Sequence, residues 1–368
     1  MKLTTTDSLK NIPADAWNAL AGDANPFIQY DFLRALETGN CLQPYGWQPH
    51  YLLAHENNEL VGAAPAYIKT NSYGEFVFDW AWAEAYQKHG LIYYPKLVIA
   101  IPYSPVTGPR LLAKDNNPDI KQALVKFALA QAEKLNLSSV HCLFNLADDH
   151  AAELSTGFMS RFDYQFHWHN NHYTDFADFL SRLQSKKRKN ILQERRKVND
   201  ACIEIKIYHG NELTAELWQI VYDFYHITFD KKSGHATLSL AFFQAIAAKL
   251  VVPIAFHNNK PVAGAICLRG KDTLYGRHWG CYAEYNSLHF ELCYYTGIEY
   301  CINNGLLHFE PGAQGEHKIA RGFLPTQTWS AHWLAHPGFS QAIADFLQRE
   351  AKAMAHYGDE LLAASPYK

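Results

Sequence analysis

A loop rich in glycine and ionisable residues holds the densest group of potentially reactive side chains in the sequence. It spans residues 310–323 and contains Glu310, Gln314, Glu316, His317, Lys318 and Arg321, together with three glycines and one proline. Glycine lets backbone N–H groups approach a ligand closely. His317, beside Glu316, is a candidate general base because the ordinary pKa of imidazole is about 6.5. Lys318 and Arg321 could hold a phosphate or a carboxylate, Arg321 by a two-pronged contact.

A strongly basic stretch is the second feature with chemical potential. Between positions 182 and 197 stand eight lysine or arginine residues and a single acid, Glu194. The pattern predicts an exposed helix over about 182–200 with a local positive potential. Such a helix could bind an anion: a nucleotide diphosphate, coenzyme A or an RNA backbone. Lys186, Lys187 and Arg188 are the candidate contacts.

Two aromatic segments, 76–82 and 275–282, are the third feature. Aromatic residues that alternate along a strand indicate packing against a core, and both segments are expected to be strands. Arg277 and His278 lie inside the second segment, and a buried charge requires a partner. Glu310, expected on the neighbouring strand, is the candidate. The motifs G-x-S-x-G, H-E-x-x-H and G-x-x-x-x-G-K-[ST] are absent from the sequence.

The first two features also have purely structural interpretations. The 310–323 loop could be a polar surface loop whose histidine and arginine bind carbonyl groups of the loop itself. The basic stretch could be the solvated face of a helix, which is the common origin of a run of charges.

A faint internal repeat indicates how these residues are positioned. Residues 51–64 and 252–265 superpose at a shift of 201, which aligns Asn57-Asn58 with Asn258-Asn259. Each copy is expected to be a hairpin with an Asn-Asn turn of positive φ. Tyr73-Gly74 matches Tyr275-Gly276 at a shift of 202, each expected to begin a strand. The repeat predicts two copies of one domain, over 1–170 and 171–368.

Amphipathic periodicity predicts the helices of the second copy. One helix is expected over about 213–228, a second after Ser239, a third from Asn286 or Ser287 to residues 303–305, and a last one over about 339–354. A short strand is expected at 306–309. The order of helices, hairpin and strands predicts an α+β fold, with helices covering a mostly antiparallel sheet.

The amino-acid composition is that of a globular protein and excludes several other classes. The 368 residues are 48% hydrophobic and 19% charged, as in a globular protein with ample core. The net charge of −3 leaves no general signature of DNA or anionic-membrane binding. No apolar run is long enough for a membrane span or a secretory signal, and the seven cysteines show no C-x-x-C spacing. A cytoplasmic protein with reduced thiols and no metal site is expected.

Several segments together resemble the FemAB-like family of bacterial predicted N-acyltransferases, relatives of the aminoacyltransferases that build peptidoglycan cross-bridges. The resemblance covers nearly the whole chain and is carried by residues 25–27, 62–67, 73–80, 105–110, 276–280, 288–295 and 310–323. Its most specific part is the run 312–318. The resemblance implies two tandem GNAT-type acyltransferase domains, in agreement with the repeat.

The resemblance also implies the roles of the candidate residues. Transfer of an acyl group to an amine requires a group that accepts the amine proton, for which the candidates are His317, Glu316 and Glu310. The candidates for substrate binding are Lys318, Arg321, Gln314, Arg277, His278, Tyr295, Lys186, Lys187, Arg188, Trp80, Trp82 and Arg110. The last three belong to the first copy, which is expected to bind the acceptor or to support the second copy.

The expected partners are an anionic acyl donor and an amine acceptor such as a muropeptide. No permanently bound cofactor is expected. The donor is expected to be aminoacyl-tRNA or acyl-coenzyme A, although the pyrophosphate loop of coenzyme-A-binding GNAT domains, Q/R-x-x-G-x-G/A, is found in neither half. Two alternatives remain open: a non-catalytic RNA- or tRNA-binding module, and a degenerate GNAT scaffold that binds muropeptides.

Overall fold

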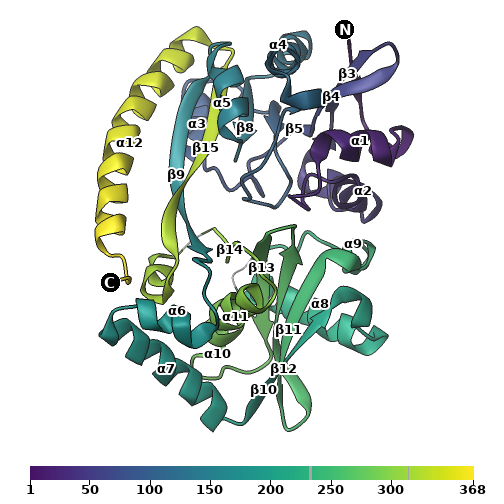
Figure 1. Ribbon diagram of the computed structural model, residues 1–368. Helices are drawn as coiled ribbons and strands as arrows, with labels where there is room; N and C mark the ends of the chain where they lie inside the picture. Colours follow the sequence, from purple (N-terminus) through teal and green to yellow (C-terminus); the bar gives the residue numbers. More distant parts are fainter. Residues whose placement is uncertain (232–233, 314) are drawn as a thin grey trace. The chain divides into compact units, whose positions relative to one another are not determined.

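The chain folds into two compact units, each built from two chain segments (Figure 1). The computed structural model describes residues 1–231, 234–313 and 315–368. Unit 1 comprises Met1–Asp163 and Gln327–His356, and unit 2 comprises Tyr164–Thr326 and Tyr357–Lys368. The chain passes between them within β9 (Met159–His169), β15 (Leu324–Leu334) and α12 (Pro337–Ala363). The functional domains predicted over 1–170 and 171–368 stay a prediction.

Unit 1 contains a four-stranded sheet, strands of a second sheet, and the helices that accompany them. Its strands are β1 (Lys2–Thr6), β2 (Trp47–Pro49), β3 (Tyr51–Glu56), β4 (Glu59–Ala64), β5 (Ala66–Lys69), β6 (Lys96–Ile99), β7 (Leu112–Ala113) and β8 (Ser139–Leu143). Its helices are α1 (Ala14–Ala21), α2 (Tyr30–Thr38), α3 (Trp80–Lys88), α4 (Pro118–Lys134) and α5 (Ala147–Leu154). One sheet has the order β1-β3-β4-β7, and β6 runs parallel to β8 in the other.

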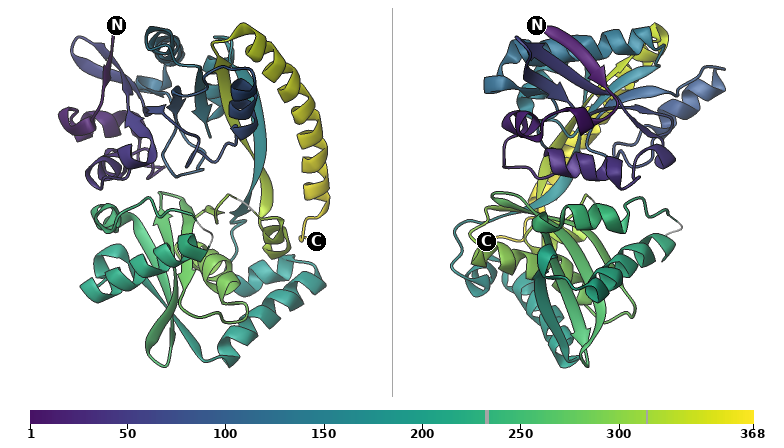
Figure 2. Two further views of the ribbon diagram at one scale, coloured as in Figure 1. Left: turned by 180° about the vertical axis from the view of Figure 1, so that it is seen from behind. Right: turned by 90° about the vertical axis from the view of Figure 1, so that its right-hand side faces the viewer.

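Unit 2 is built around six neighbouring strands with the order β10-β11-β12-β13-β14-β9. Its strands are β10 (Ile203–His209), β11 (Leu250–His257), β12 (Lys260–Arg269), β13 (Thr273–Cys281) and β14 (His308–Glu310). Its helices are α6 (Phe176–Arg182), α7 (Ser185–Asp200), α8 (Ala215–Lys231), α9 (Leu240–Ala245), α10 (Leu288–Phe290) and α11 (Thr296–Asn303), with a π-helical turn at Glu291–Tyr295. Helices α8 and α11 lie on opposite faces of the sheet (Figures 1 and 2). The α+β fold class is therefore confirmed, with the predicted order of helices, hairpin, strand, helix and strand.

The predicted duplication is visible in the strand order. Strands β1-β3-β4 of unit 1 and β10-β11-β12 of unit 2 are joined in the same antiparallel sequence. The hairpins carry a register shift at the same place, between Ala54 and His55 and between Ala255 and Phe256, which again differ by 201 positions. Beyond the hairpins the two copies diverge.

The divergence overturns the prediction for residues 73–82. Tyr73 and Gly74 lie in a turn instead of beginning a strand, and Trp80 starts helix α3. Phe76 has a φ of 62°, which no strand residue adopts. The physical reason is ionic, because Glu75 and Asp79 both turn inward to the fully buried ammonium of Lys96. Only the counterpart around Tyr275 is a strand, β13.

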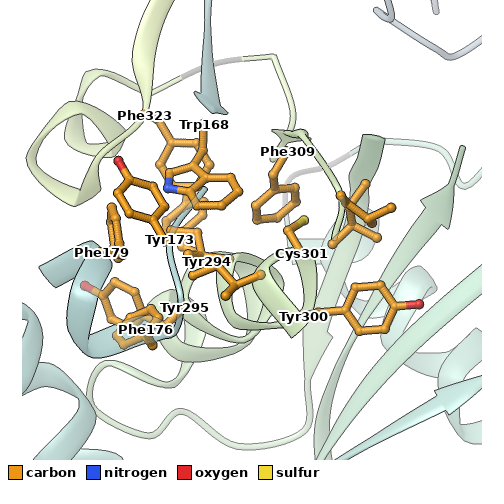
Figure 3. Packing of buried hydrophobic residues seen from close by; sticks show 14 of the residues in the cluster. Trp168, Tyr173, Phe176, Phe179, Tyr294, Tyr295, Tyr300, Cys301, Phe309 and Phe323 are labelled. Carbon is orange, nitrogen blue, oxygen red and sulfur yellow. The ribbon is translucent and has the colours of Figure 1, made fainter. Parts of the chain in front are cut away.

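The predicted helices of unit 2 are confirmed with small changes in length. Helix α8 begins at Ala215, two residues after the start of the predicted 213–228 pattern, and extends to Lys231. The Ser239 hydroxyl accepts a hydrogen bond from the backbone N–H of Phe242 at the start of α9. Ser287 precedes α10 but makes no side-chain cap. Trp168, Tyr173, Phe176 and Phe179 pack with the 294–309 region into the core of the unit (Figure 3). Among the residues described, no helix is both long and apolar enough to cross a membrane.

The Asn-Asn turns are confirmed and yield a first prediction. Asn57 and Asn58 have φ values of 48° and 66°, in the left-handed region that a β-carbon disfavours. We expect Asn58→Ala to lower the free energy of unfolding by about 1–2 kcal/mol, since alanine lacks the local hydrogen bonding that helps asparagine adopt this conformation. Asn58→Gly is the matched control and should cost nothing. Urea denaturation of both variants measures the difference; equal losses would contradict the conformational explanation.

Candidate active site

The sheet of unit 2 opens at the position where β14 ends. Strands β13 and β14 run parallel and pair from Thr273 with His308 to Tyr275 with Glu310. Beyond this point the chain after β14 turns through Pro311 and Gly312, while β13 continues to Cys281. The two strands therefore separate beside Glu310, and polar groups can enter the opening.

Strand β13 contains a bulge two residues after Tyr275, the residue that pairs with Glu310. The register with β12 pairs Cys267 with Gly276 and Ile266 with His278, so that Arg277 is the extra residue. The extra residue of a bulge is left out of the regular ladder, and bulges often re-aim a side chain next to an active site. The bulge thus sets Arg277 apart from the regular alternation of the strand.

Glu310 and Arg277 form the charged centre of this opening. Arg277 Nη2 lies 3.7 Å from Glu310 Oε2, and the two side chains are 6% and 12% exposed, which confirms the pairing expected from the sequence. His167 Nε2 on β9 lies 4.0 Å from the same carboxylate oxygen. Burial raises the pKa of Glu310 to about 7, and the positive charge of Arg277 only partly opposes the shift. Glu310 thus takes up and releases a proton near neutral pH.

His167 was not found by the sequence analysis. It lies on β9, more than 140 residues before Glu310 in the chain, and no local motif marks it. Burial, together with neighbouring positive charges that include His169 and Arg277, lowers its pKa to about 3. The imidazole is therefore neutral at physiological pH and leaves Arg277 as the cationic partner of Glu310.

Lys318 is a buried residue within the loop. Its ammonium donates a 2.7 Å hydrogen bond to the carbonyl oxygen of Gly312, and the residue is 2% exposed. Burial, followed by the charge of Arg277, lowers the pKa of Lys318 to about 8. This hydrogen bond joins the two ends of the turn between Gly312 and Lys318. The predicted contact of Lys318 with substrate stays a prediction.

Arg321 connects the loop to α7 and to Tyr295 through hydrogen bonds. Its Nη2 donates to Glu194 Oε1 at 2.7 Å, its Nε to the hydroxyl of Tyr295 at 3.0 Å and its Nη1 to the carbonyl of His317 at 2.8 Å. The Tyr295 hydroxyl donates in turn to the other carboxylate oxygen of Glu194. The guanidinium also lies 3.5 Å from the ring centroid of Phe290. All three nitrogens of Arg321 therefore have partners within unit 2.

Glu194 is the second residue that sequence reasoning missed. It was counted as the lone acid of a basic stretch on α7, whereas it binds both Arg321 and Tyr295. A single acid among eight cations could have been recognised as a site of a specific ion pair. Through Glu194, helix α7 is connected directly to the candidate loop.

The side chains of His317 and Glu316 bind different partners. The Nε2 of His317 and the hydroxyl of Tyr294 are within hydrogen-bond distance at 2.9 Å. Burial and the charges of Arg321 and Lys318 lower the pKa of His317, which keeps the ring neutral and able to accept a proton. Glu316 is exposed and accepts a 2.7 Å hydrogen bond from the hydroxyl of Tyr357 on α12. Gln314, also a candidate, lies outside the described residues.

The other candidates of unit 2 lie on β13 and on α7. His278 packs against the rings of Tyr225 and Phe243, and burial lowers its pKa to about 3. Lys186, Lys187 and Arg188 lie on the first turns of α7, with Lys186 exposed and the other two half-buried.

Trp80, Trp82 and Arg110 belong to unit 1. Trp80 is 40% exposed at the start of α3, whereas Trp82 is buried against His332. Arg110 is fully buried and donates to the carbonyl oxygens of Leu143 and Val106 among others. Their predicted role in substrate binding stays a prediction.

A pocket borders the last residues of β13. It has a volume of about 370 Å³ and is lined by Thr228, Lys231, Trp279, Cys281 and His289 among others. The walls therefore come from α8, β13 and the start of α10. Among the residues described, no cluster of three or more histidine, cysteine or acidic side chains could hold a metal ion.

Comparison with known proteins gives a family and a fold. A model of the FemAB_like family, described as peptidoglycan biosynthesis/recognition, matches residues 8–368. No curated protein matches the chain significantly.

Three solved structures illustrate the similarity. The crystal structure of FemX has 10% sequence identity and a TM-score of 0.57, over 94% of this chain and 100% of that one. The C-terminal domain of a putative lysylphosphatidylglycerol synthetase from Agrobacterium fabrum has 8% identity and a TM-score of 0.54, over 92% and 95%. L-PGS from Bacillus licheniformis has 10% identity and a TM-score of 0.52, over 89% and 98%. At such identities the likeness establishes the fold alone.

Proposed function

The chain belongs to the FemAB_like family, and on this premise we propose that it is an N-acyltransferase that moves an activated acyl or aminoacyl group to an amine. The family supports an acyltransferase-type role. The observation that carries the proposal is the buried carboxyl of Glu310, which lies where β13 and β14 separate and has a pKa raised to about 7. A general base works best when its pKa is near the operating pH.

The proposed reaction uses this carboxylate as the proton acceptor. The amine nitrogen of the acceptor attacks the carbonyl carbon of the donor, and Glu310 removes the proton that the nitrogen must lose. The tetrahedral oxyanion needs hydrogen-bond donors, which the backbone N–H groups at the Arg277 bulge of β13 would supply. The intermediate then collapses: the bond from carbon to the oxygen or sulfur of the donor breaks, and the leaving group takes the proton from Glu310.

The remaining groups of the site would position the substrates. Arg277 would keep the carboxyl of Glu310 in place, and Arg321 and Lys318 would hold the loop in position; their contacts with Glu310, Glu194 and the Gly312 carbonyl support these roles. His317, neutral and bonded to Tyr294, is a second group able to receive the proton. The pocket at the end of β13 offers room for one of the substrates.

The proposed acceptor is taken from the description of the family. Because the family is described as peptidoglycan biosynthesis/recognition, we propose a peptidoglycan precursor or a related amine-bearing molecule of the cell envelope. The proposed donor is aminoacyl-tRNA or acyl-coenzyme A.

A ligand panel tests this function. Charged tRNA, acyl-coenzyme A and muropeptide nucleotides are each added to the protein, and thermal stabilisation is measured; ligands that stabilise are then combined and the product mass is determined. A mass increase of the acceptor by one acyl group is the expected result. The absence of both stabilisation and product with every combination would count against the proposal.

The exposed cations of α7 favour one alternative, an RNA-binding module without catalysis. This alternative predicts salt-sensitive RNA binding that persists in His317→Ala and Glu310→Gln and is lost when Lys186, Lys187 and Arg188 are neutralised. Detection of acyl transfer would exclude it. Affinity for muropeptides without any turnover would instead indicate a degenerate scaffold.

A further inference from the structure

Strand β10 (Ile203–His209) lies at one end of its sheet and has a neighbouring strand on one side only. That neighbour is β11, with which β10 pairs along its whole length. Among the residues described, no loop backbone bonds to the main chain of residues 203–208. An edge of this kind presents a row of backbone donors and acceptors that a further strand can use.

The two faces of β10 differ in character. Ile203, Ile205 and Ile207 lie on one face, because side chains alternate along a strand. Ile203 is buried in a small core cluster of this face, Ile205 packs against the same cluster, and Ile207 is 40% exposed. Glu204 and Lys206 lie on the other face and form an exposed ion pair 3.3 Å apart. The strand therefore carries a row of isoleucines on one face and one charge of each sign on the other.

A second copy of β10 fits this edge in an antiparallel register centred on Ile205. When a twofold axis relates the two strands at this residue, each Glu204 stands opposite Lys206 of the other copy. In the same register Ile203 stands opposite Ile207, and Ile205 stands opposite its own counterpart. Opposite charges and β-branched side chains are both favourable as directly opposed pairs. Every position from 203 to 207 is therefore matched by its partner.

The neighbouring registers are less favourable. An axis at Glu204 brings two carboxylates together, and an axis at Lys206 brings two ammonium groups together; like charges directly opposite each other are destabilising. An axis at Ile207 places Lys206 opposite Tyr208 and Glu204 opposite Gly210, so that neither charge meets its opposite. Charged residues on an edge strand usually prevent pairing. Here the two charges select one register and disfavour the others.

We propose that β10 is an interface at which two copies of this chain form a symmetric dimer through an antiparallel β10–β10 pair. A twofold interface uses the same surface of both copies and must be self-complementary, as the register centred on Ile205 is. The pairing also covers Ile207, which the single chain leaves exposed, with Ile203 of the other copy. Because a single strand pair is smaller than a standard protein interface, we expect a reversible dimer with a dissociation constant in the micromolar range.

Charge reversal at the two polar positions tests the interface. Sedimentation velocity of the full chain is expected to show a doubling of the mass as the protein concentration is raised. Glu204→Lys and Lys206→Glu each place two like-charged pairs across the axis, and each is expected to raise the dissociation constant about tenfold or more. The two side chains are 58% and 46% exposed, so the melting temperatures of both variants should match that of the parent.

An equimolar mixture of the two variants separates contacts between chains from contacts within one chain. The mixture sets the two lysines of one variant opposite the two glutamates of the other, and dimers should therefore reappear. Neither variant regains the ion pair within its own strand, so this recovery reports the interface alone. Glu84→Lys is the matched control, because Glu84 forms an equally exposed pair with Lys88 on α3. It should change the dissociation constant by less than about twofold.

Three results would overturn the proposal. A parent chain that stays monomeric at every concentration would leave the edge to a strand of another protein. Dimers that persist unchanged in both single variants would place the interface elsewhere, and a mixture that stays monomeric would reject the register. The measurement uses no substrate, and β11 and β12 separate β10 from the opening beside Glu310. A failure of acyl transfer would therefore contradict the proposed function alone.

Discussion

Glu310→Gln is expected to lower kcat of acyl transfer by about 100-fold or more, while the protein keeps its fold. Glutamine preserves the shape of the side chain but cannot accept the proton of the attacking amine, and general base catalysis contributes a factor of about 100 to 10,000. In the parent protein, kcat/KM should rise with pH through about 7, the pKa that burial gives to Glu310. Initial rates measured across the pH range should show this rise in the parent and its loss in the variant.

Although Glu310→Gln is expected to lower the rate, it is expected to stabilise the folded protein above neutral pH. The pKa of Glu310 is raised from 4.5 to about 7, so the folded protein holds the proton more tightly than the unfolded chain does. Its contribution to stability is fully present below about 4.5 and is lost as the pH rises to about 7. With about 1.4 kcal/mol for each pKa unit, glutamine should raise the free energy of unfolding by up to roughly 3 kcal/mol above neutral pH, with little change at low pH.

Glu204→Gln is the control for both measurements. Glu204 lies on β10 of the same unit with its side chain 58% exposed, close to Lys206. This substitution should alter neither the rate nor its pH dependence. A Glu310→Gln enzyme with full activity and an unshifted profile would remove Glu310 from the role of base and leave His317 and Glu316 as the candidates.

The second large effect is expected at the ion pair between Arg321 and Glu194. Arg321→Ala leaves the carboxylate of Glu194 without its cation, and breaking a largely buried pair in this way costs about 3 kcal/mol. Since Arg321 also binds the carbonyl of His317, the loop should lose its fixed position, and we expect kcat/KM to fall about 100-fold. Arg321→Lys should be nearly as damaging, because an ammonium group cannot reach Glu194, Tyr295 and His317 together.

A double-mutant cycle separates positioning from general destabilisation. Arg321→Ala, Glu194→Gln and the double variant are compared by urea denaturation and by kcat/KM. A coupling energy of about 2 kcal/mol is expected, because the two side chains act as one unit. Glu299→Gln, which removes the more exposed partner of Arg195, is the matched control and should cost about 1 kcal/mol or less with normal activity. Additive effects of the two single substitutions would show that the pair does not hold the loop.

Local patterns in the sequence predicted the structure correctly where the backbone conformation depends on residues that are neighbours in the chain. Asn57-Asn58 and Asn258-Asn259 specify their turns because asparagine tolerates positive φ, and both hairpins form as predicted. The run of glycines and charges at 310–323 marks the candidate loop because glycine and proline interrupt regular structure. Arg277 and Glu310 were paired from the requirement that a buried charge has a partner.

The sequence failed where a distant partner decides the conformation. Residues 73–82 have the composition of a strand, but Lys96 draws Glu75 and Asp79 inward and α3 begins at Trp80. Ionic contacts of this kind override strand propensity, which depends strongly on context.

The sequence alone therefore determined the duplicated α+β fold and the loop that carries the ionisable residues, because periodicity and turn chemistry are local properties. The family followed from the resemblance of several segments. Only the tertiary structure decided what each charge does. It placed Glu194 of a basic helix on Arg321, brought His167 from β9 to Glu310, and buried Glu310 enough to bring its pKa to about 7. Protonation and pairing depend on burial and on groups far apart in the chain, and these are the quantities that periodicity does not contain.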